Sequence, residues 1–291
     1  MKRAKLLMST VLPKPIKLNE EWSKFRSVVL EAKAAGERGF IYFVRTDVKS
    51  AFVTVRHQKV LEVLEKHVSS LPAQVQVEER PLNPWVFRKF QRVAIQPKQQ
   101  DSEESTDSAD ITPQPSTNQK PPPVQNTSLV AVSRDSAYKT LLQEINNQVI
   151  RYGAREFRMC VGLAQGGPLS NHLCNMTLED MTQKHLSEFT TEDGRSVLWR
   201  VADDFLFLTL DDHMARRFQD VTRKGFHSYG WHMNDSKSET NLENQGLTTV
   251  SFNGAIFNLA SLEAKADFPT CAPDTVLNLI SFKQNFNTVE A

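Results

Sequence analysis

The sequence predicts an α+β fold in which an antiparallel sheet packs against helices. In residues 196–209, two short apolar runs flank the adjacent acids Asp203 and Asp204, a pattern typical of the two strands of a tight hairpin. Another strand-like run, 40–44, leads to Asp47. Amphipathic segments between these runs give the order strand–helix, helix–hairpin, helix–strand, which indicates a split βαβ arrangement of the ferredoxin-like kind. We expect the face of this sheet to carry the acids.

Two helices are predicted in the first third of the chain. Residues 19–35 have apolar side chains at helical spacing and acids in the first turn, followed by Gly36. Residues 56–68 repeat the apolar spacing. Residues 85–95 alternate loosely between apolar and basic side chains and predict a strand, which either contacts a phosphate backbone or simply faces solvent.

The same patterns predict further elements beyond residue 128. In chain order these are a helix at 138–150, a strand at 157–163, a helix from Pro168, a helix at 212–224 and a hairpin at 248–259. Asp211 has the side chain of a helix N-cap, and Gly225 suits the end of the same helix. Glycines in the segment 162–170 let the backbone come close to a ligand.

Residues 97–128 differ in kind from the rest of the chain. They contain six prolines and no aromatic residue, and five acids fall between Asp101 and Asp110. Such a composition cannot bury enough apolar surface to offset chain entropy, so we predict a disordered insertion. The recognisable motifs resume beyond it, and it is therefore an insertion within a domain.

Composition allows a sizeable core and suggests a nucleic-acid partner. The chain has 291 residues, of which 40% are apolar, and no apolar run is long enough to cross a membrane. Residues 1–98 hold 19 Lys and Arg against 9 Asp and Glu, a net charge of +10, and the remainder has a net charge of −9. A basic first third either follows a nucleic-acid backbone or is a solvated face. The three cysteines have no metal-ligand spacing, which fits a reducing compartment.

Asp47, Asp203 and Asp204 form a candidate metal site. Adjacent carboxylates in an apolar hairpin repel each other and lose hydration, and folding alone gives no reason for them. Mg²⁺ prefers carboxylate oxygens together with substrate phosphates and water. Three such acids can share two ions about 3.5–4 Å apart, which promote in-line displacement at phosphorus. An isolated Asp-Asp pair is more often a turn that faces water, so the other motifs must decide.

Three motifs resemble motifs A, B and C of reverse transcriptases. They are Asp47-Val-Lys-Ser-Ala-Phe52, Gln165-Gly-Gly-Pro-Leu-Ser170 and Ala202-Asp-Asp-Phe-Leu206. The segment 200–209, the pattern Tyr229-Gly230…Asn234…Lys237…Asn241 and the long insertion between motifs A and B are similar to telomerase reverse transcriptase. The resemblance covers residues 19–286.

This resemblance implies a right-hand polymerase palm, with an antiparallel sheet and packed helices, part of the fingers and a disordered insertion. On this basis the chain divides into an N-terminal basic extension (1–18), palm with motif A and the start of the fingers insertion (19–96), the insertion (97–128), palm with motifs B to E (129–262) and the start of a C-terminal extension (263–291).

The resemblance also implies roles for the acids and for a lysine. Asp47 and Asp203 would hold two Mg²⁺ ions with Asp204 in support, and the main-chain carbonyl of Val48 would complete the coordination. Lys237 matches the motif D lysine, a proton donor or charge partner for pyrophosphate. Outside this context, a lysine at that position is usually only a surface cation.

Nucleotide and template contacts are assigned in the same way. Phe52 stands where reverse transcriptases have an aromatic side chain that collides with a ribose 2′-hydroxyl, which implies deoxynucleotide substrates; the alternative is a plain core residue. Gln165 and Gly166 would pack against the template–primer or the incoming base pair. Gly167 and Phe252-Asn253-Gly254 depart from the family, which commonly has Ser and Trp-Cys-Gly there.

The implied function is RNA-templated DNA synthesis by two-metal-ion nucleotidyl transfer. The expected partners are a telomerase template RNA, the single-stranded 3′ end of telomeric DNA and deoxynucleoside triphosphates, in the nucleus and with no membrane partner. The finger motifs that precede motif A in the family and the thumb that follows motif E have no counterpart here, so we expect a fragment or a natural truncation. The alternatives are a retroelement reverse transcriptase and a truncated, non-catalytic nucleoprotein scaffold.

Overall fold

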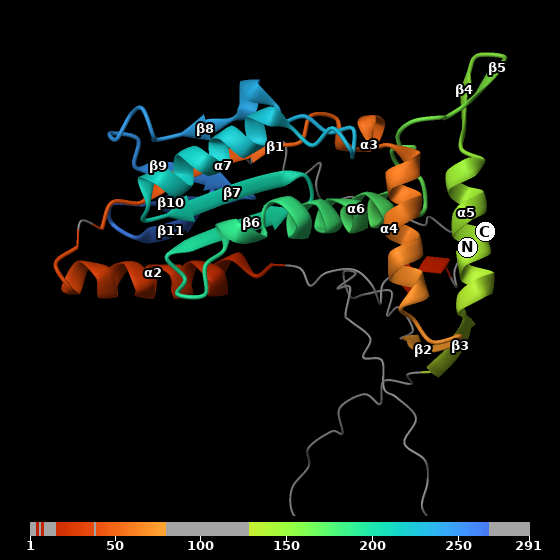
Figure 1. Cartoon of the computed structure of the whole chain (residues 1–291), viewed down its shortest axis with the longest axis horizontal. Helices are drawn as coiled ribbons and strands as arrows, with labels where there is room; N and C mark the ends of the chain where they lie inside the picture. The colour runs from red at the N-terminus through yellow and green to blue at the C-terminus, as the bar shows by residue number, and fades with distance from the viewer. Residues whose placement is uncertain (1–3, 6, 9–15, 38, 80–127, 268–291) are drawn as a thin grey trace, which may run out of the picture. The chain divides into compact units, whose positions relative to one another are not determined.

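The structure is a computed structural model that describes residues 4–5, 7–8, 16–37, 39–79 and 128–267 (Figure 1). The chain forms two compact units: residues 1–13 with 52–177, called here the first unit, and residues 14–51 with 178–291, the second unit. Helices and strands are mixed, and every strand pair in the described residues is antiparallel. The predicted α+β class is confirmed.

A four-stranded sheet is the centre of the second unit. Its strands, in spatial order, are β6 (Ser196–Val201), β7 (Asp204–Thr209), β1 (Tyr42–Asp47) and β8 (Glu239–Thr240). The chain passes from β1 through helix α6 (Ser170–His185) to β6, and β7 lies between these two strands and antiparallel to both. This is the split βαβ arrangement that the order of elements predicts.

One face of this sheet is covered by helix α2 (Leu18–Ala34) and by a three-stranded sheet. The small sheet consists of β9 (Thr249–Phe252), β10 (Ala255–Asn258) and β11 (Glu263–Ala266), in the order β11-β10-β9. Trp22 of α2 lies 4.9 Å from Phe257 and 6.3 Å from Trp199, measured between ring centroids. Phe43 of β1 is fully buried in the same cluster. The predicted helix 19–35 and hairpin 248–259 are confirmed, and β11 is a strand that the sequence did not predict.

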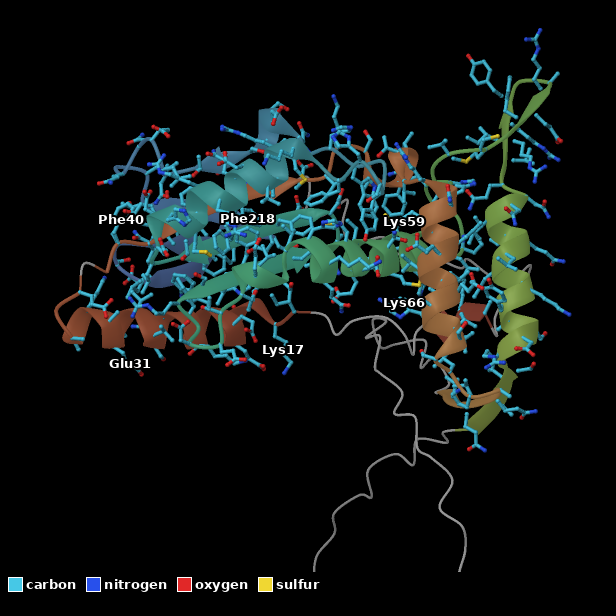
Figure 2. All side chains as sticks on the ribbon, viewed as in Figure 1. Lys17, Glu31, Phe40, Lys59, Lys66 and Phe218 are labelled. Carbon is cyan, nitrogen blue, oxygen red and sulfur yellow. The ribbon has the colours of Figure 1, made fainter. Side chains whose placement is uncertain are left out.

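Helix α7 (Asp212–Lys224) packs on β1 and β7 from the other side. The side chain of Asp211 accepts hydrogen bonds from the backbone N–H groups of His213 and Met214, so it is the N-cap that the sequence predicts. Phe218 of α7 (labelled in Figure 2) stacks on Phe207, with ring centroids 4.7 Å apart. Gly225 ends the helix with φ +71°, a left-handed conformation that suits glycine.

The first unit contains helices α4 (His57–Ser69) and α5 (Arg134–Asn146), which pack together. A hairpin of β2 (Gln74–Glu79) and β3 (Ser128–Ser133) was not predicted. A second hairpin consists of β4 (Val149–Tyr152) and β5 (Arg155–Arg158). Other short elements in the described residues include α3 (Ala51–Thr54), η1 (Ser187–Phe189) and η2 (Asp235–Lys237).

Two predicted boundaries in the first unit are wrong. The helix predicted at 138–150 starts earlier, because the Ser133 hydroxyl accepts a hydrogen bond from the Ser136 N–H and caps α5. It also ends earlier, because residues 149–150 pair with residues 157–158 in the β4–β5 hairpin. The strand predicted at 157–163 ends at Arg158.

Two predictions fall largely outside the described residues. The predicted strand 85–95 lies outside them, as does the predicted insertion up to residue 127, whereas Ser128 begins β3. No helix in the described part of the chain combines the length and the hydropathy needed to cross a bilayer.

We predict that Phe43→Ala lowers the free energy of unfolding by about 3–5 kcal/mol, because it leaves a cavity in the aromatic cluster between β1 and α2. Urea denaturation of the full chain, followed by far-UV circular dichroism, measures the change. Leu30→Ala is the matched control on α2, because Leu30 is 46% exposed whereas Phe43 is 0% exposed. Equal effects of the two substitutions would contradict the position of the core.

Candidate active site

The three predicted acids meet at one end of the four-stranded sheet. Asp47 is the last residue of β1 and Asp204 the first of β7, and the antiparallel register places them opposite each other. Asp203 lies in the turn just before β7, and its carbonyl oxygen accepts a hydrogen bond of 3.0 Å from the Val48 N–H. Asp47 and Asp204, which are 157 positions apart in the sequence, therefore share one site because their two strands pair.

The turn between β6 and β7 is held in an uncommon conformation. Ala202 has φ +54°, in the left-handed region that residues other than glycine rarely adopt. The Arg200 guanidinium donates 2.9 Å to the Ala202 carbonyl oxygen and 2.7 Å to the Glu179 carboxylate on α6. Arg200 thus fixes the turn that presents Asp203. The sequence analysis did not assign a role to Arg200. An arginine two residues before Ala202 could have indicated a contact with the turn.

Burial and electrostatic repulsion both disfavour the charged form of Asp204. Burial raises the pKa of its carboxyl group, and the negative charges of Asp203 and Asp47 raise it further. The positive charges of Arg45 and Lys237 oppose this shift and do not cancel it. A bound cation would oppose these effects, because it favours the charged form of a carboxyl group.

Asp47 has one carboxylate oxygen engaged and one without a partner. Its Oδ2 accepts a hydrogen bond of 3.1 Å from Lys237 Nζ. Its Oδ1 is buried and has no hydrogen-bond partner among the described residues. A buried, ionised oxygen without a partner is unfavourable, and a hard cation such as Mg²⁺ would satisfy it.

The donor set fits such an ion, but the side chains are not gathered around one. Among the residues that the structure describes, no group of three or more His, Cys, Asp or Glu side chains is arranged to hold a metal. Lys237 also contacts Asp47 directly. Coordination of one ion by all three acids would therefore require these side chains to rearrange.

Lys237 reaches the acids from the short helix η2. The hydrogen bond to Asp47 and the charge of that residue raise the lysine pKa, so Lys237 stays protonated at neutral pH. The ammonium group is largely exposed, whereas Asp47 is almost buried. The structure thus brings together Lys237 and Asp47, and the role of the lysine in proton transfer stays a prediction.

Hydrogen bonds from β1 hold η2 in place. The Thr46 hydroxyl donates 2.8 Å to Ser238 Oγ, because the Ser238 hydroxyl itself donates to the Asn234 carbonyl oxygen. The Asn234 N–H in turn donates 2.9 Å to the carbonyl oxygen of Asp47. The sequence did not predict the hydrogen bond between Thr46 and Ser238. Only the alternation of side chains along a strand indicates that Thr46 faces away from Asp47.

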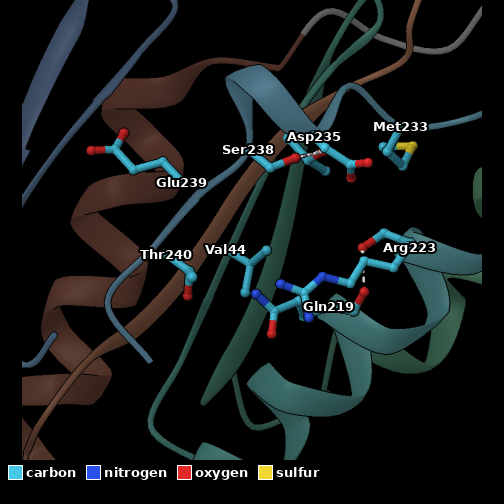
Figure 3. Close-up of a pocket in the computed structure, with 10 residues that line it drawn as sticks. Val44, Gln219, Arg223, Met233, Asp235, Ser238, Glu239 and Thr240 are labelled. Atoms are coloured by element: carbon cyan, nitrogen blue, oxygen red, sulfur yellow. Dashed lines mark hydrogen bonds between the residues drawn. The ribbon is translucent and has the colours of Figure 1, made fainter. Parts of the chain in front are cut away.

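A pocket of about 380 Å³ lies between β1, α7 and the segment 233–240 (Figure 3). It is lined by Val44, Thr46, Gln219, Thr222, Arg223, Met233, Asp235, Ser238, Glu239 and Thr240. Successive side chains of a strand point to opposite faces, so Thr46 lines this pocket while Asp47 does not. The carboxylate site is therefore separate from this pocket, but the two share β1 and η2.

Phe52 lies in the first unit beside the segment that leads to the glycine loop. Its carbonyl oxygen accepts a hydrogen bond of 2.6 Å from the Leu163 N–H. Gly162 has φ +80°, and a Cβ there would lie 2.4 Å from the Val53 carbonyl oxygen, so only glycine allows this close approach. The Phe52 side chain is half-buried.

Gln165 and Gly166 form an exposed turn before α6. The Gly167 N–H donates 2.9 Å to the Ala164 carbonyl oxygen and closes this turn. The Ala164 N–H donates 2.7 Å to the side-chain oxygen of Gln148. Gly166 has φ +84° and open space around its Cα, so the turn needs a residue that tolerates this backbone. Contact of this turn with a template–primer stays a prediction.

Comparisons with known proteins identify relatives of one kind. No protein-family model matches the chain. Telomerase reverse transcriptase of Oryza sativa subsp. japonica is 24% identical over 189 residues, which are 57% of this chain and 15% of the relative. The protein of the same name from Canis lupus familiaris is 23% identical over 283 residues, or 89% of this chain and 24% of the relative. The chain thus spans about a quarter or less of the length of these relatives.

Solved telomerase structures share the fold. The apo telomerase of Candida tropicalis has a TM-score of 0.63 at 15% identity, and the similarity covers 93% of this chain and 39% of that one. The telomerase of Candida albicans in complex with a TWJ fragment of telomeric RNA also has a TM-score of 0.63, at 16% identity, over 91% of this chain and 38% of that one. The resemblance to telomerase reverse transcriptase that the motifs predict is confirmed.

We predict that Asp204→Asn stabilises the metal-free chain near pH 7, by up to about 1 kcal/mol because solvent screens a half-buried carboxyl group. The folded-state pKa of Asp204 is raised above the reference of 3.8, so its favourable contribution is complete below that value and is lost as the pH rises through the folded pKa. The gain from Asn should therefore vanish near pH 3. Urea denaturation in EDTA at both pH values measures it.

The control for this prediction is Asp220→Asn, at an exposed position on α7. It should leave the free energy of unfolding almost unchanged at both pH values. A stabilisation by Asp204→Asn that is the same near pH 3 as near pH 7 would show that repulsion among the three acids is not its cause.

Proposed function

We propose that this chain, a relative of telomerase reverse transcriptases, is the catalytic palm region of an RNA-directed DNA polymerase with part of its fingers. It would extend the 3′ ends of telomeric DNA with deoxynucleotides on an RNA template. The observation that carries the proposal is the pairing of Asp47 with Asp204 next to Asp203, at the end of a split βαβ sheet. Folding alone does not favour three carboxyl groups at this place.

Two Mg²⁺ ions would be held by Asp47, Asp203 and Asp204, with the Val48 carbonyl as a further ligand. When bound, these ions supply activation of the primer 3′-hydroxyl and neutralisation of the charge on the leaving pyrophosphate. The raised pKa of Asp204 and the buried, partnerless Oδ1 of Asp47 support the assignment, because a bound cation would favour the charged form of Asp204 and would give Asp47 Oδ1 a partner.

Lys237 would supply a proton or a positive charge to the pyrophosphate. Its raised pKa keeps the ammonium group protonated, and its exposure lets the side chain move from Asp47 toward a bound substrate. Phe52 would exclude ribonucleotides, and Gln165 and Gly166 would pack against the template–primer or the incoming base pair. The half-buried Phe52 ring and the exposed turn at Gln165 leave both surfaces accessible for these contacts.

The proposed partners follow from this reaction. They are a telomerase template RNA, a single-stranded DNA primer and deoxynucleoside triphosphates, and the place of action is the chromosome end in the nucleus. The telomeric RNA fragment bound to the Candida albicans telomerase supports an RNA partner for this chain as well.

We predict that Asp203→Ala abolishes primer extension, with a loss of at least about a hundredfold, because one of the two principal metal ligands is removed. The assay uses the protein reconstituted with template RNA, a telomeric DNA primer and Mg²⁺. Asp220→Ala is the control, because this exposed acid on α7 lies outside the site. Extension that persists in the Asp203 variant, with an unchanged melting temperature, would refute the proposed function.

We predict that Phe52→Ala raises the use of ribonucleotides relative to deoxynucleotides by about tenfold or more, the effect expected when a steric contact is removed from a pocket. Single-nucleotide incorporation with matched dNTP and rNTP measures the ratio. Val53→Ala is the control, because this neighbouring side chain is 58% exposed. If Phe52 were only a packing residue, its variant would lose stability without a change in this ratio.

A further inference from the structure

The pocket between β1, α7 and the segment 233–240 offers polar groups that the proposed reaction does not use. Its volume is about 380 Å³ (Figure 3). Ligand pockets in proteins begin at about 300 Å³, so a small organic molecule fits this space. Val44 of β1 and Met233 supply apolar parts of the lining. The pocket, called here the α7 pocket, therefore has the size and the mixed lining of a ligand site.

Two hydrogen-bond donors enter the α7 pocket from one face of the helix. Gln219 and Arg223 are one helical turn apart, and their side chains extend into the pocket (Figure 3). Among the described residues, neither the Gln219 amide nor the Arg223 guanidinium has a hydrogen-bond or ion-pair partner. The other arginines of α7 are paired: Arg216 lies 3.0 Å from Asp212, and Arg217 forms an ion pair with a glutamate. Arg223 is thus the α7 arginine that is available to a ligand.

The hydroxyl groups that line the pocket already donate to the protein. Those of Thr222 and Thr240 each donate 2.8 Å to a main-chain carbonyl oxygen. The Thr46 hydroxyl donates to Ser238, whose own hydroxyl donates to a further main-chain oxygen. The side-chain donors that remain for a ligand are therefore those of the glutamine and the arginine of α7.

The charges of the lining favour a ligand with a single negative charge. A guanidinium and a neighbouring amide match the planar oxygens of a carboxylate. The Glu239 carboxylate lies 3.8 Å from Arg45, which offsets its charge, whereas the charge of Asp235 opposes that of Arg223. A dianion such as inorganic phosphate is repelled by these carboxylates more strongly than a monoanion is.

We propose that the α7 pocket binds a small organic monocarboxylate. The ligand carboxylate accepts hydrogen bonds from Arg223 and Gln219, and its apolar part packs on Val44 and Met233. None of these four side chains takes part in nucleotidyl transfer as proposed above. The pocket is therefore a second binding site, additional to the three acids.

The α7 pocket shares a wall with the proposed active site. Thr46 and Ser238 line the pocket, and the hydrogen bond between them holds η2, which carries Lys237. A ligand that contacts this wall stabilises it, so that binding is coupled to the position of the lysine. Regulation of nucleotide transfer through this wall rests on the proposed function, whereas the binding itself does not.

The test follows the methionine methyl groups of the full chain by proton–carbon correlation NMR during titration with isocaproate, a branched monocarboxylate. The chain has seven methionines, and the variant Met233→Leu identifies the signal of Met233. That signal should shift and saturate with a dissociation constant of about 1 mM, the affinity expected for a ligand with few atoms. The other methionine signals serve as the internal reference.

Arg223→Gln should weaken the binding of isocaproate about tenfold or more, because hydrogen bonds from a charged donor are lost. Lys224→Gln is the matched control, since it removes the same charge from the next residue of α7, which does not line the pocket. Its affinity should equal that of the wild type. Isocaproamide, the neutral ligand of the same shape, should also bind about tenfold more weakly than isocaproate.

A Met233 signal that does not saturate would overturn the proposal, as would equal affinity of the wild type and the Arg223→Gln variant. Inorganic phosphate that binds as tightly as isocaproate would overturn the assigned ligand class. Isocaproate should slow amide hydrogen exchange in residues 234–240, and unchanged exchange would overturn the coupling to Lys237.

The Asp203→Ala variant separates these results from failure of the proposed function. It should bind isocaproate with the affinity of the wild type, because Asp203 does not line the α7 pocket. Primer extension that persists in this variant refutes the proposed function and leaves the binding result standing.

Discussion

The antiparallel register between β1 and β7 is the constraint on which the rest of the site depends. It places Asp47 opposite Asp204, and the turn that joins β6 to β7 adds Asp203. Like charges at this distance repel, so the strands must be held together by other interactions. Leu206 and Phe43, both fully buried between the sheet and α2, supply part of that stabilisation. A rigid apolar sheet is what keeps the acids in one place.

Side-chain hydrogen bonds, rather than a long strand, fasten the segment that carries Lys237. The buried Asn241 accepts a bond from the Phe43 N–H and donates to the Ile41 carbonyl oxygen. Trp231 donates from its indole to the Ala51 carbonyl oxygen. Each of these polar groups is buried and satisfied, which favours a single conformation for the segment. The lysine therefore reaches Asp47 from a firm support, while its own side chain is largely exposed.

The two compact units differ in how they present functional groups. In the second unit, the acids lie at the end of a sheet whose two faces are covered, so their geometry is set by packing. In the first unit, the turn at Gln165 and the β4–β5 hairpin are exposed and held mainly by backbone hydrogen bonds. The geometry of the three acids is therefore set by packing, whereas the turn and the hairpin lie at the surface.

The sequence by itself determined the elements whose causes are local. Helix α7 with its Asp211 cap and the hairpin at 196–209 follow from apolar spacing and from turn residues within a few positions. Residues 149–150 fit a helical pattern as well, and only their pairing with 157–158 made them a strand. The hydrogen bond between Lys237 and Asp47 joins residues that are 190 positions apart. The bond between Arg200 and Glu179 joins β6 to α6. Such contacts depend on side-chain directions after strands and helices have packed, and tertiary structure alone decides them.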